Sequence, residues 1–319
     1  MANLKTFTLT NFTTHSGKFY SQFPLHYEHF GADYKTAPVV LVNHSLTGDS
    51  RVCGDNGWWS EMVGPGLSID TDKYAIIAFN IPGNGVANSH YDNYKDFHTG
   101  DIAKLFFLGL DKLGITSLFA NIGGSIGGGI VWEMAALYPE LAQYLIPVAA
   151  DWKASDWIIA NTFLQRRILE NSSKPLEDAR IHAMLTYRTP HSLDFRFSRS
   201  MNQELNIYNV ESWLLHHGLK LANRFDLKAY TMMNHLLSSI NITRDNVSFK
   251  KIVSKISASI HLISIDTDLF FTSDEDQKTY NKIKAFKDNI SYYEIDSIHG
   301  HDAFLIENLK MSQILKQIF

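Results

Sequence analysis

The sequence predicts an α/β fold whose mostly parallel sheet has about eight strands. Several continuous apolar runs have the length and composition of strands that are buried on both faces. Segments with helical spacing of apolar residues lie between several of these runs, and this alternation is typical of a parallel sheet covered by helices on both faces. A glycine-rich turn, Gly123-Gly-Ser-Ile-Gly127, joins one of the runs to one of the helices.

The predicted elements follow one another regularly along the chain. Residues 1–30 alternate apolar and polar side chains, as antiparallel edge strands do. Buried strands are predicted at 38–42, 74–79, 117–122, 144–149, 260–265 and 290–295. Helices are predicted at 101–113, 127–137 and 274–286. We therefore assign residues 1–150 and 251–319 to one α/β core.

The interval 151–250 interrupts this alternation. It contains no convincing buried strand, but it is rich in helix formers and in large side chains such as Trp152, Phe163, Trp213 and Tyr230. We interpret it as a helical insertion that covers the carboxyl edge of the sheet as a cap, rather than as an independent domain.

Composition and charge restrict the class of protein. The 319 residues are 45% apolar and carry a formal charge of −4, which suits a large folded core. Acidic residues outnumber basic ones and no basic run exceeds two residues, so nucleic-acid binding is not expected. No apolar run approaches the roughly 20 residues that span a bilayer, and the first residues do not resemble a signal segment. The single cysteine, Cys53, excludes an internal disulfide and agrees with a cytoplasmic location.

Ser125 is the strongest candidate for a catalytic nucleophile. It lies between a strand-length apolar run and a segment with helical spacing that ends before Pro139. A strand, a Gly-x-Ser-x-Gly turn and a helix in this order form the context of a nucleophile elbow, in which the serine is presented at the carboxyl edge of the sheet. The alternative is a glycine-rich turn with an idle serine, and the flanking strand and helix favour the nucleophile.

A serine hydroxyl is a weak nucleophile near neutral pH and needs a base that is itself oriented by an acid. In α/β-hydrolase folds the acid and then the histidine follow the serine along the chain. Asp266 and Asp268 follow the predicted strand 260–265, and His299 and His301 follow the last predicted strand. Order and placement are satisfied, but the residues alone leave both pairs open.

The same mechanism needs backbone donors for the developing oxyanion, each worth on the order of 3 kcal/mol of barrier. One is the N–H of Ile126, and the other is expected from the loop 43–48 after the first buried strand. We interpret His44 in this loop as a residue that shapes it rather than as a proton carrier. The alternative for His299, His301 and Asp302 is a metal site, but these residues lie where the base is needed, so no metal is expected.

Several blocks along the chain carry a resemblance to one enzyme family. The most distinctive is Trp58-Trp-Ser-Glu-Met-Val-Gly-Pro-Gly66, followed by Ile69-Asp-Thr-Asp-Lys-Tyr74. Further blocks lie at 27–31, 42–49, 185–189, 196–197, 223–230, 267–270 and 300–305. On these blocks the chain resembles, from about residue 25 to 306, the homoserine O-acetyltransferase family of α/β-hydrolase-fold acyltransferases.

The resemblance implies a role for each site residue. It selects Asp268 as the acid and His301 as the base, and it assigns the second oxyanion donor to the N–H of Leu46. It suggests that Asp302 receives the ammonium group of the substrate and that Arg166 clamps its carboxylate as a planar fork. It further implies a homodimer joined through the insertion.

The implied reaction is a ping-pong acetyl transfer from acetyl-CoA to L-homoserine in methionine biosynthesis, with acetyl-CoA as co-substrate and no bound cofactor. The chain departs from the family pattern in the loop 81–90, in a shorter insertion between Leu169 and Arg180, and in Ile126, where methionine is usual. The alternatives are a serine esterase, an acyltransferase that uses L-serine or succinyl-CoA, and a catalytically silent binding protein.

Overall fold

An eight-stranded sheet forms the centre of the computed structural model, which describes residues 4–319. Residues 1–3 of the predicted core and N-terminal segment lie outside the described part. The strand order is β1-β2-β6-β3-β7-β8-β11-β12, in which β1, β2 and β6 pair antiparallel and the remaining neighbours pair parallel. The predicted α/β fold with a mostly parallel sheet of eight strands is therefore confirmed.

The strands agree closely with the predicted ranges. The large sheet contains β1 (Lys5–Thr13), β2 (Phe19–Gly31), β3 (Val39–Asn43), β6 (Ala75–Phe79), β7 (Leu118–Gly124), β8 (Ala142–Val148), β11 (Ser259–Ile265) and β12 (Ile290–Ile295). Two short strands, β4 (Val63–Gly64) and β5 (Ile69–Asp70), pair apart from it. All five residues of β3 are buried, and alternate ones belong to the two hydrophobic cores on opposite faces of the sheet. Burial on both faces explains why β3 is a continuous apolar run rather than an alternating one.

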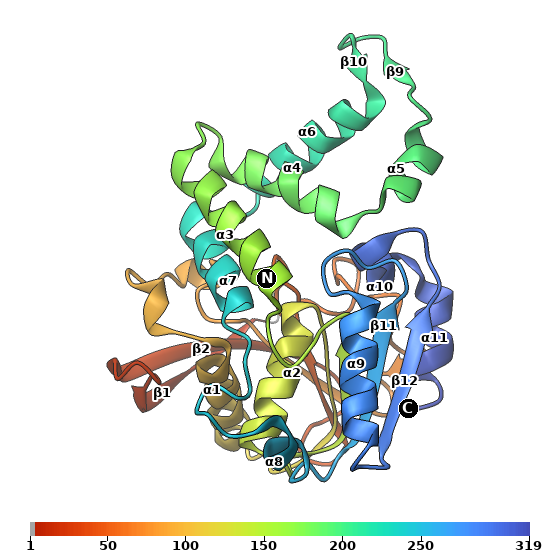
Figure 1. Ribbon diagram of the computed structural model, residues 1–319. Coiled ribbons are helices and arrows are strands. Elements are labelled where there is room, and N and C mark those ends of the chain that lie inside the picture. The colour runs from red at the N-terminus through yellow and green to blue at the C-terminus, as the bar shows by residue number, and fades with distance from the viewer. Residues whose placement is uncertain (1–3) are drawn as a thin grey trace.

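Helices cover both faces of this sheet (Figure 1). The helices of the core are α1 (Thr99–Lys112), α2 (Ile126–Leu137), α8 (Phe249–Val253), α9 (Ser273–Lys284), α10 (Ala303–Ile306) and α11 (Asn308–Leu315), with 3-10 turns η1 (Val86–Asn88), η2 (Tyr94–Asp96) and η3 (Gly300–Asp302). Apolar residues of α1, α2 and α9 belong to one core, and those of α11 belong to the other.

Five helices form a cap beyond the carboxyl ends of the parallel strands (Figure 1). They are α3 (Asp156–Asn171), α4 (Pro175–Tyr187), α5 (Pro190–Phe197), α6 (Asn209–Ala222) and α7 (Leu227–Ser238). Their starts carry local signals, since Ser155, Thr189 and Asp226 accept hydrogen bonds from the first turns of α3, α5 and α7.

The interval 151–250 differs from its prediction in two details. A hairpin of β9 (Met201–Asn202) and β10 (Ile207–Tyr208) joins α5 to α6 at the far end of the cap (Figure 1). After α7 the chain returns along the core to α8, where Phe249 packs on Trp152 with ring centroids 4.4 Å apart. The last residues of the predicted insertion therefore lie beside the core.

A buried ion pair fixes this return of the chain. Glu133 on α2 is 1% exposed, and its carboxylate accepts hydrogen bonds from the Arg244 guanidinium, the Thr99 hydroxyl at 2.7 Å and the Asn241 N–H at 3.0 Å. Four donors around one carboxylate compensate its burial. The described helices include none with the length and apolarity needed to cross a membrane.

Candidate active site

Ser125 occupies a sharp turn between β7 and α2. Its φ and ψ angles are 58° and −127°, a strained backbone conformation for a residue with a side chain. Glycines on both sides allow the close approach that this turn needs, because a Cβ atom on Gly127 would lie 2.3 Å from the Asn43 carbonyl oxygen. On Gly123 it would lie 2.5 Å from the backbone of Gly127. The sequence thus forces the serine to the carboxyl end of β7.

Ser125, His301 and Asp268 form a hydrogen-bonded chain. The Ser125 Oγ lies 3.0 Å from His301 Nε2, and His301 Nδ1 lies 2.7 Å from Asp268 Oδ2. The other oxygen of Asp268 accepts hydrogen bonds from the N–H groups of Phe270 at 2.6 Å and Phe271 at 3.0 Å. Asp268 accepts from His301 Nδ1–H, which leaves Nε2 free to take the serine proton.

Aromatic rings enclose His301. The rings of Tyr187, Phe270, Phe271 and Phe304 have centroids 5.2–5.8 Å from the imidazole. All three members of the hydrogen-bonded chain are at most 4% exposed. Exclusion of water from this site strengthens the electrostatic interactions among the three groups.

The two neighbours that the residues alone left open lie in other networks. Asp266 accepts a hydrogen bond from the Ser297 N–H at 2.9 Å, which ties the end of β11 to the end of β12. His299 Nδ1 lies 2.9 Å from the Arg188 guanidinium and 3.1 Å from the Ser192 hydroxyl. His299 and His301 thus have separate partners, and residues 4–319 contain no group of three histidine, cysteine or acidic side chains that could hold a metal ion.

The loop after β3 faces Ser125. Both ring nitrogens of His44 have hydrogen-bond partners. Nε2 accepts from the Ile81 N–H at 2.9 Å, and Nδ1 therefore donates to the Ser45 carbonyl at 2.8 Å. Burial lowers the pKa of His44, which keeps the ring neutral. The Leu46 N–H makes no hydrogen bond to any of the described residues, and the N–H of Ile126, the first residue of α2, has no partner within the helix. Neither N–H group is therefore engaged by the backbone of the described residues.

One pocket contains Ser125 together with two oppositely charged side chains. Its walls are Ser45, Leu46, Thr47, Ser125, Arg180, Tyr187, His301, Asp302, Phe304 and Leu305. The buried Nε of Arg180 has no hydrogen-bond acceptor among residues 4–319, and its guanidinium carbon lies 5.8 Å from the centre of the Tyr187 ring. Burial raises the pKa of Asp302, while Arg180, His301 and Arg188 oppose this shift.

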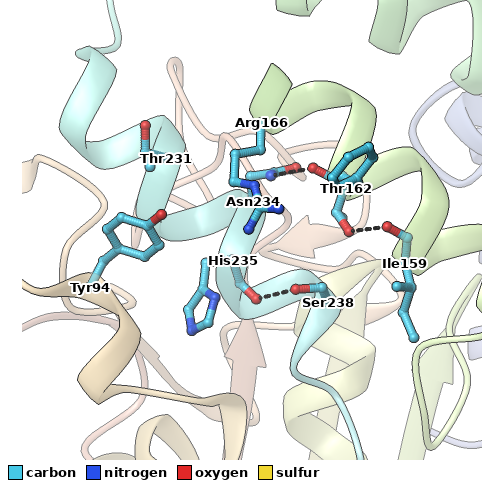
Figure 2. A pocket seen from close by; sticks show the side chains of 9 residues that line it. Tyr94, Ile159, Thr162, Arg166, Thr231, Asn234, His235 and Ser238 are labelled. Carbon is cyan, nitrogen blue, oxygen red and sulfur yellow. Dashed lines mark hydrogen bonds between the residues drawn. The ribbon is translucent and has the colours of Figure 1, made fainter. Parts of the chain in front are cut away.

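Arg166 is not in this pocket, contrary to the prediction from the resemblance. The buried face of α3 carries Gln165 and Leu169, so Arg166 points away from Ser125. It lines a separate hollow between α3 and α7, which Figure 2 shows with Tyr94 and His235 on its walls. Its guanidinium lies over the Phe163 ring and 3.9 Å from the Glu170 carboxylate.

The arginine in this pocket is Arg180, which is not among the residues predicted from the sequence. The sequence contains a signal, because Arg180 and Tyr187 are seven residues apart within the insertion expected to be helical, and this spacing puts two side chains on the same face of a helix. Tyr187 lies in the block 185–189, which is one of those that carry the family resemblance. The choice between the two arginines depends on the rotation of α3 and α4 about their axes.

Comparison with known proteins agrees with this geometry. The family model described as "alpha/beta hydrolase fold" matches residues 38–234. A homoserine O-acetyltransferase of Cyclobacterium marinum is 33% identical over 311 residues, which cover 88% of this chain and 84% of that protein.

Two solved structures have nearly the same backbone path as this chain. A homoserine O-acetyltransferase of Staphylococcus aureus has a TM-score of 0.82 at 25% identity, over 98% of this chain and 94% of that one. The esterase E22 has a TM-score of 0.87 at 18% identity over 99% of both chains, which shows a common fold. The chain therefore belongs to the α/β-hydrolase fold family and, within it, to the homoserine O-acetyltransferase family.

Proposed function

We propose that this protein transfers the acetyl group of acetyl-CoA to the side-chain hydroxyl of L-homoserine through an acetyl-Ser125 intermediate. The observation that carries the proposal is the pocket itself. The hydrogen-bonded Ser125, His301 and Asp268 share it with a cation, Arg180, that lacks an acceptor at its Nε, and with the carboxyl group of Asp302.

The first half-reaction acylates the serine. His301 Nε2 takes the proton of the Ser125 hydroxyl while Oγ attacks the thioester carbonyl, and the N–H groups of Leu46 and Ile126 stabilise the oxyanion. The carbon–sulfur bond then breaks, and the thiolate of CoA leaves with the proton from His301. Asp268 stabilises the imidazolium that exists between the two proton transfers.

The second half-reaction repeats this chemistry with an alcohol. His301 removes the proton from the homoserine hydroxyl, whose oxygen attacks the acetyl carbonyl of the acyl-enzyme. The bond to Ser125 Oγ breaks, and Oγ regains its proton from His301. The products are O-acetyl-L-homoserine and CoA, so neither an oxidant nor a metal is needed for the balance.

The charges in the pocket suit a zwitterionic amino acid. The planar guanidinium of Arg180 can bind a carboxylate with two parallel hydrogen bonds. Asp302 lines the same pocket, and its carboxylate form is a counter-ion for an α-ammonium group. In the proposed acceptor site, Arg180 rather than Arg166 therefore binds the carboxylate of the substrate, and Asp302 binds its ammonium group.

The charge of the cap supports a polyanionic donor such as acetyl-CoA. Residues 180–228 contain seven lysines and arginines but only four acidic residues, whereas the whole chain has a charge of −4. Arg224 donates hydrogen bonds to the Thr47 carbonyl at 2.8 Å and to the Thr47 hydroxyl at 3.2 Å, at the edge of the Ser125 pocket. A basic surface near the pocket raises the rate at which an anionic substrate arrives.

We also infer a homodimer and a cytoplasmic location. Leu215 and Leu219 on α6 are 50% and 52% exposed, and they lie four residues apart on one face of the helix. This outer face of the cap suits contact with a second copy of the chain. The cytoplasm is the compartment where acyl-CoA is available and where the free thiol of Cys53 stays reduced.

The test is thiol release from acetyl-CoA by the purified protein with L-homoserine, with L-serine, or with no acceptor. We expect release that depends on homoserine and yields O-acetylhomoserine. Release at the same rate without an acceptor would instead identify an esterase, and preference for serine would identify a different acceptor. A protein that releases no thiol under any of these conditions, although it is folded, would overturn the acyl-transfer proposal.

A further inference from the structure

A second cavity, here called the inner cavity, adjoins the loop 43–48 after β3. It shares two wall residues, Leu46 and Tyr187, with the Ser125 pocket, and it is otherwise bounded by residues of α3, α4 and α7 and by Phe270. The N–H of Leu46 is one of the two proposed oxyanion donors. The carbonyl of an acyl-enzyme would therefore lie at the junction of the two cavities, with its oxygen toward Leu46.

The Ser125 pocket is larger than the inner cavity, just as the CoA part of an acyl-CoA is larger than its acetyl group. The free volume is about 60 Å³ in the Ser125 pocket but only about 10 Å³ in the inner cavity. The latter is roughly the space of one water molecule, and a methyl group is of similar size. Given the proposed function, on which this inference rests, the inner cavity suits the methyl group of an acetyl-enzyme.

The far wall of the inner cavity separates it from the hollow shown in Figure 2. Thr162 on α3 and Asn234 on α7 line both spaces. Both residues are buried, and the Asn234 Nδ2 donates a hydrogen bond of 2.9 Å to the Thr162 carbonyl (Figure 2). The Thr162 hydroxyl donates to the Ile159 carbonyl at 2.9 Å, which fixes its own rotamer.

Beyond this wall, the hollow has a free volume of about 160 Å³, much more than the inner cavity. Ile159 and Phe163 give it an apolar side. Removal of the wall would therefore create a continuous passage from Ser125 into a space that can hold several more methylene groups.

We propose that Asn234 and Thr162 form the end wall of the acyl pocket and restrict the donor to an acetyl group. Asn234 is the key residue, because its side chain fills the gap between α3 and α7, while the bond to Thr162 only orients it. Selectivity for the acyl group is thus set on the cap helices rather than beside the nucleophile.

The experiment measures the first turnover of thiol release from acetyl-CoA, butyryl-CoA and hexanoyl-CoA. Asn234→Ala opens the wall, whereas Asn234→Leu removes the hydrogen bond but keeps a side chain of similar size. Ser238→Ala is the control, because Ser238 lines the hollow but not the inner cavity. Thermal unfolding of each variant confirms that the compared proteins are folded.

We expect Asn234→Ala to increase the hexanoyl-to-acetyl rate ratio by more than about tenfold, the lower range for one methylene in a pocket. Asn234→Leu and Ser238→Ala should keep the wild-type preference for acetyl. An unchanged ratio in a folded, acetylating Asn234→Ala protein would overturn the inference. Equal shifts in the alanine and leucine variants would also overturn it, because they would trace the effect to the lost hydrogen bond. Failure of the acylation step in the proposed function is distinguishable, since then none of the three donors would acylate the wild-type protein, whereas failure of transfer to homoserine would leave the donor ratios measurable.

Discussion

At the scale of single residues, the reactivity of Ser125 depends on which nitrogen of His301 carries the proton. The carboxylate of Asp268 accepts only, so it holds the proton on Nδ1 at 2.7 Å. Two backbone N–H groups hold Asp268 in turn, so the orientation of the whole chain of groups is fixed before a substrate arrives.

Asp268→Asn tests this proton placement. The amide is similar in shape, but its NH2 group can donate to Nδ1, which favours the wrong tautomer of His301 and leaves the imidazolium without a counter-charge. We expect kcat to fall by about 10⁴ with little change in the fold. Steady-state kinetics and circular dichroism would check this, and a loss of less than tenfold would show that Asp268 does not orient the base.

The two arginines provide a matched pair for the acceptor site. Arg180→Gln should raise the KM for L-homoserine by about 10- to 100-fold, since hydrogen bonds to charged groups contribute about 1.5–3 kcal/mol. Arg166→Gln should leave KM unchanged, because Arg166 lies in the separate hollow. Acceptor titrations at saturating acetyl-CoA distinguish the two, and a larger effect at Arg166 would reverse our assignment.

The meeting of Ser125, Asp268 and His301 at the strand ends could be predicted from the sequence, and the charged lining of the pocket could not. Ser125 and the acid and histidine candidates follow buried strands, and parallel strands bring their carboxyl ends to one edge. The choice of Asp268 over Asp266 depends on the path of a short loop, which the residues alone do not determine. The choice of Arg180 over Arg166 depends on how α3 and α4 pack on the core.

At the scale of elements, the cap is attached to the core through a charged junction. Glu133 on α2 binds Arg244 in the segment that returns from α7, and the side chain of Arg244 is 16% exposed. The Glu133 carboxylate and the Arg244 guanidinium have too little contact with water for hydration to replace the partner charge. The junction therefore couples the position of α7, and with it the wall of the inner cavity, to the helix that follows Ser125.

Glu133→Gln should lower the free energy of unfolding by about 3 kcal/mol, because it leaves a largely buried guanidinium without its counter-charge. Glu170→Gln is the matched control, since the Arg167–Glu170 pair is exposed and such pairs contribute less than about 1 kcal/mol. Urea unfolding of both variants provides the comparison. Similar small losses in the two would show that the Glu133–Arg244 pair contributes no more than a surface pair.

At the scale of the whole molecule, two buried acidic residues lie between the end of the sheet and a covering helix, Asp151 after β8 and Asp276 on α9. Burial raises the pKa of Asp151 to about 7, with Glu275 as a further cause. Burial also raises the pKa of Asp276 well above its ordinary value, with the charge of Asp151 as the next cause. Asp151 Oδ1 accepts from the Trp152 N–H and the Thr279 hydroxyl, both at 2.8 Å, and Lys153 weakly opposes the shift.

This pair makes stability depend on pH. Between pH 4 and pH 7 the folded protein binds more protons at Asp151 than the unfolded chain does, so stability falls as the pH rises through this window. Asp151→Asn stays neutral and keeps both acceptor bonds. Between pH 5 and pH 8, the free energy of unfolding should fall in both proteins. We expect this fall to be smaller in the variant than in the wild type, by on the order of 2–4 kcal/mol.

Urea unfolding at both pH values measures this difference. Equal losses in the wild type and in the Asp151→Asn variant would show that Asp151 ionises in the folded protein as readily as in water. The active-site carboxylate Asp268 is unchanged in the variant, so acetyl transfer serves as a check on the fold.

The overall architecture follows from the sequence better than the shape of the cap does. Runs such as β3 and β6 are apolar on both faces, and this pattern has few alternatives to a covered parallel sheet. In the cap, exposed side chains such as Leu215 and Phe195 interrupt the usual helical pattern of one apolar face. The apolar residues of this region therefore do not mark one buried face, and neither the β9–β10 hairpin nor the outer face of the cap could be predicted.

The most direct test of the central claim is to isolate the acyl-enzyme and follow its discharge. Mixing the protein with acetyl-CoA alone should increase its mass by one acetyl group on the peptide that contains Ser125. L-Homoserine should then remove this group far faster than buffer does, with O-acetylhomoserine as the product. Discharge at the same rate with and without homoserine, or full transfer activity with no acetylated Ser125, would contradict the account.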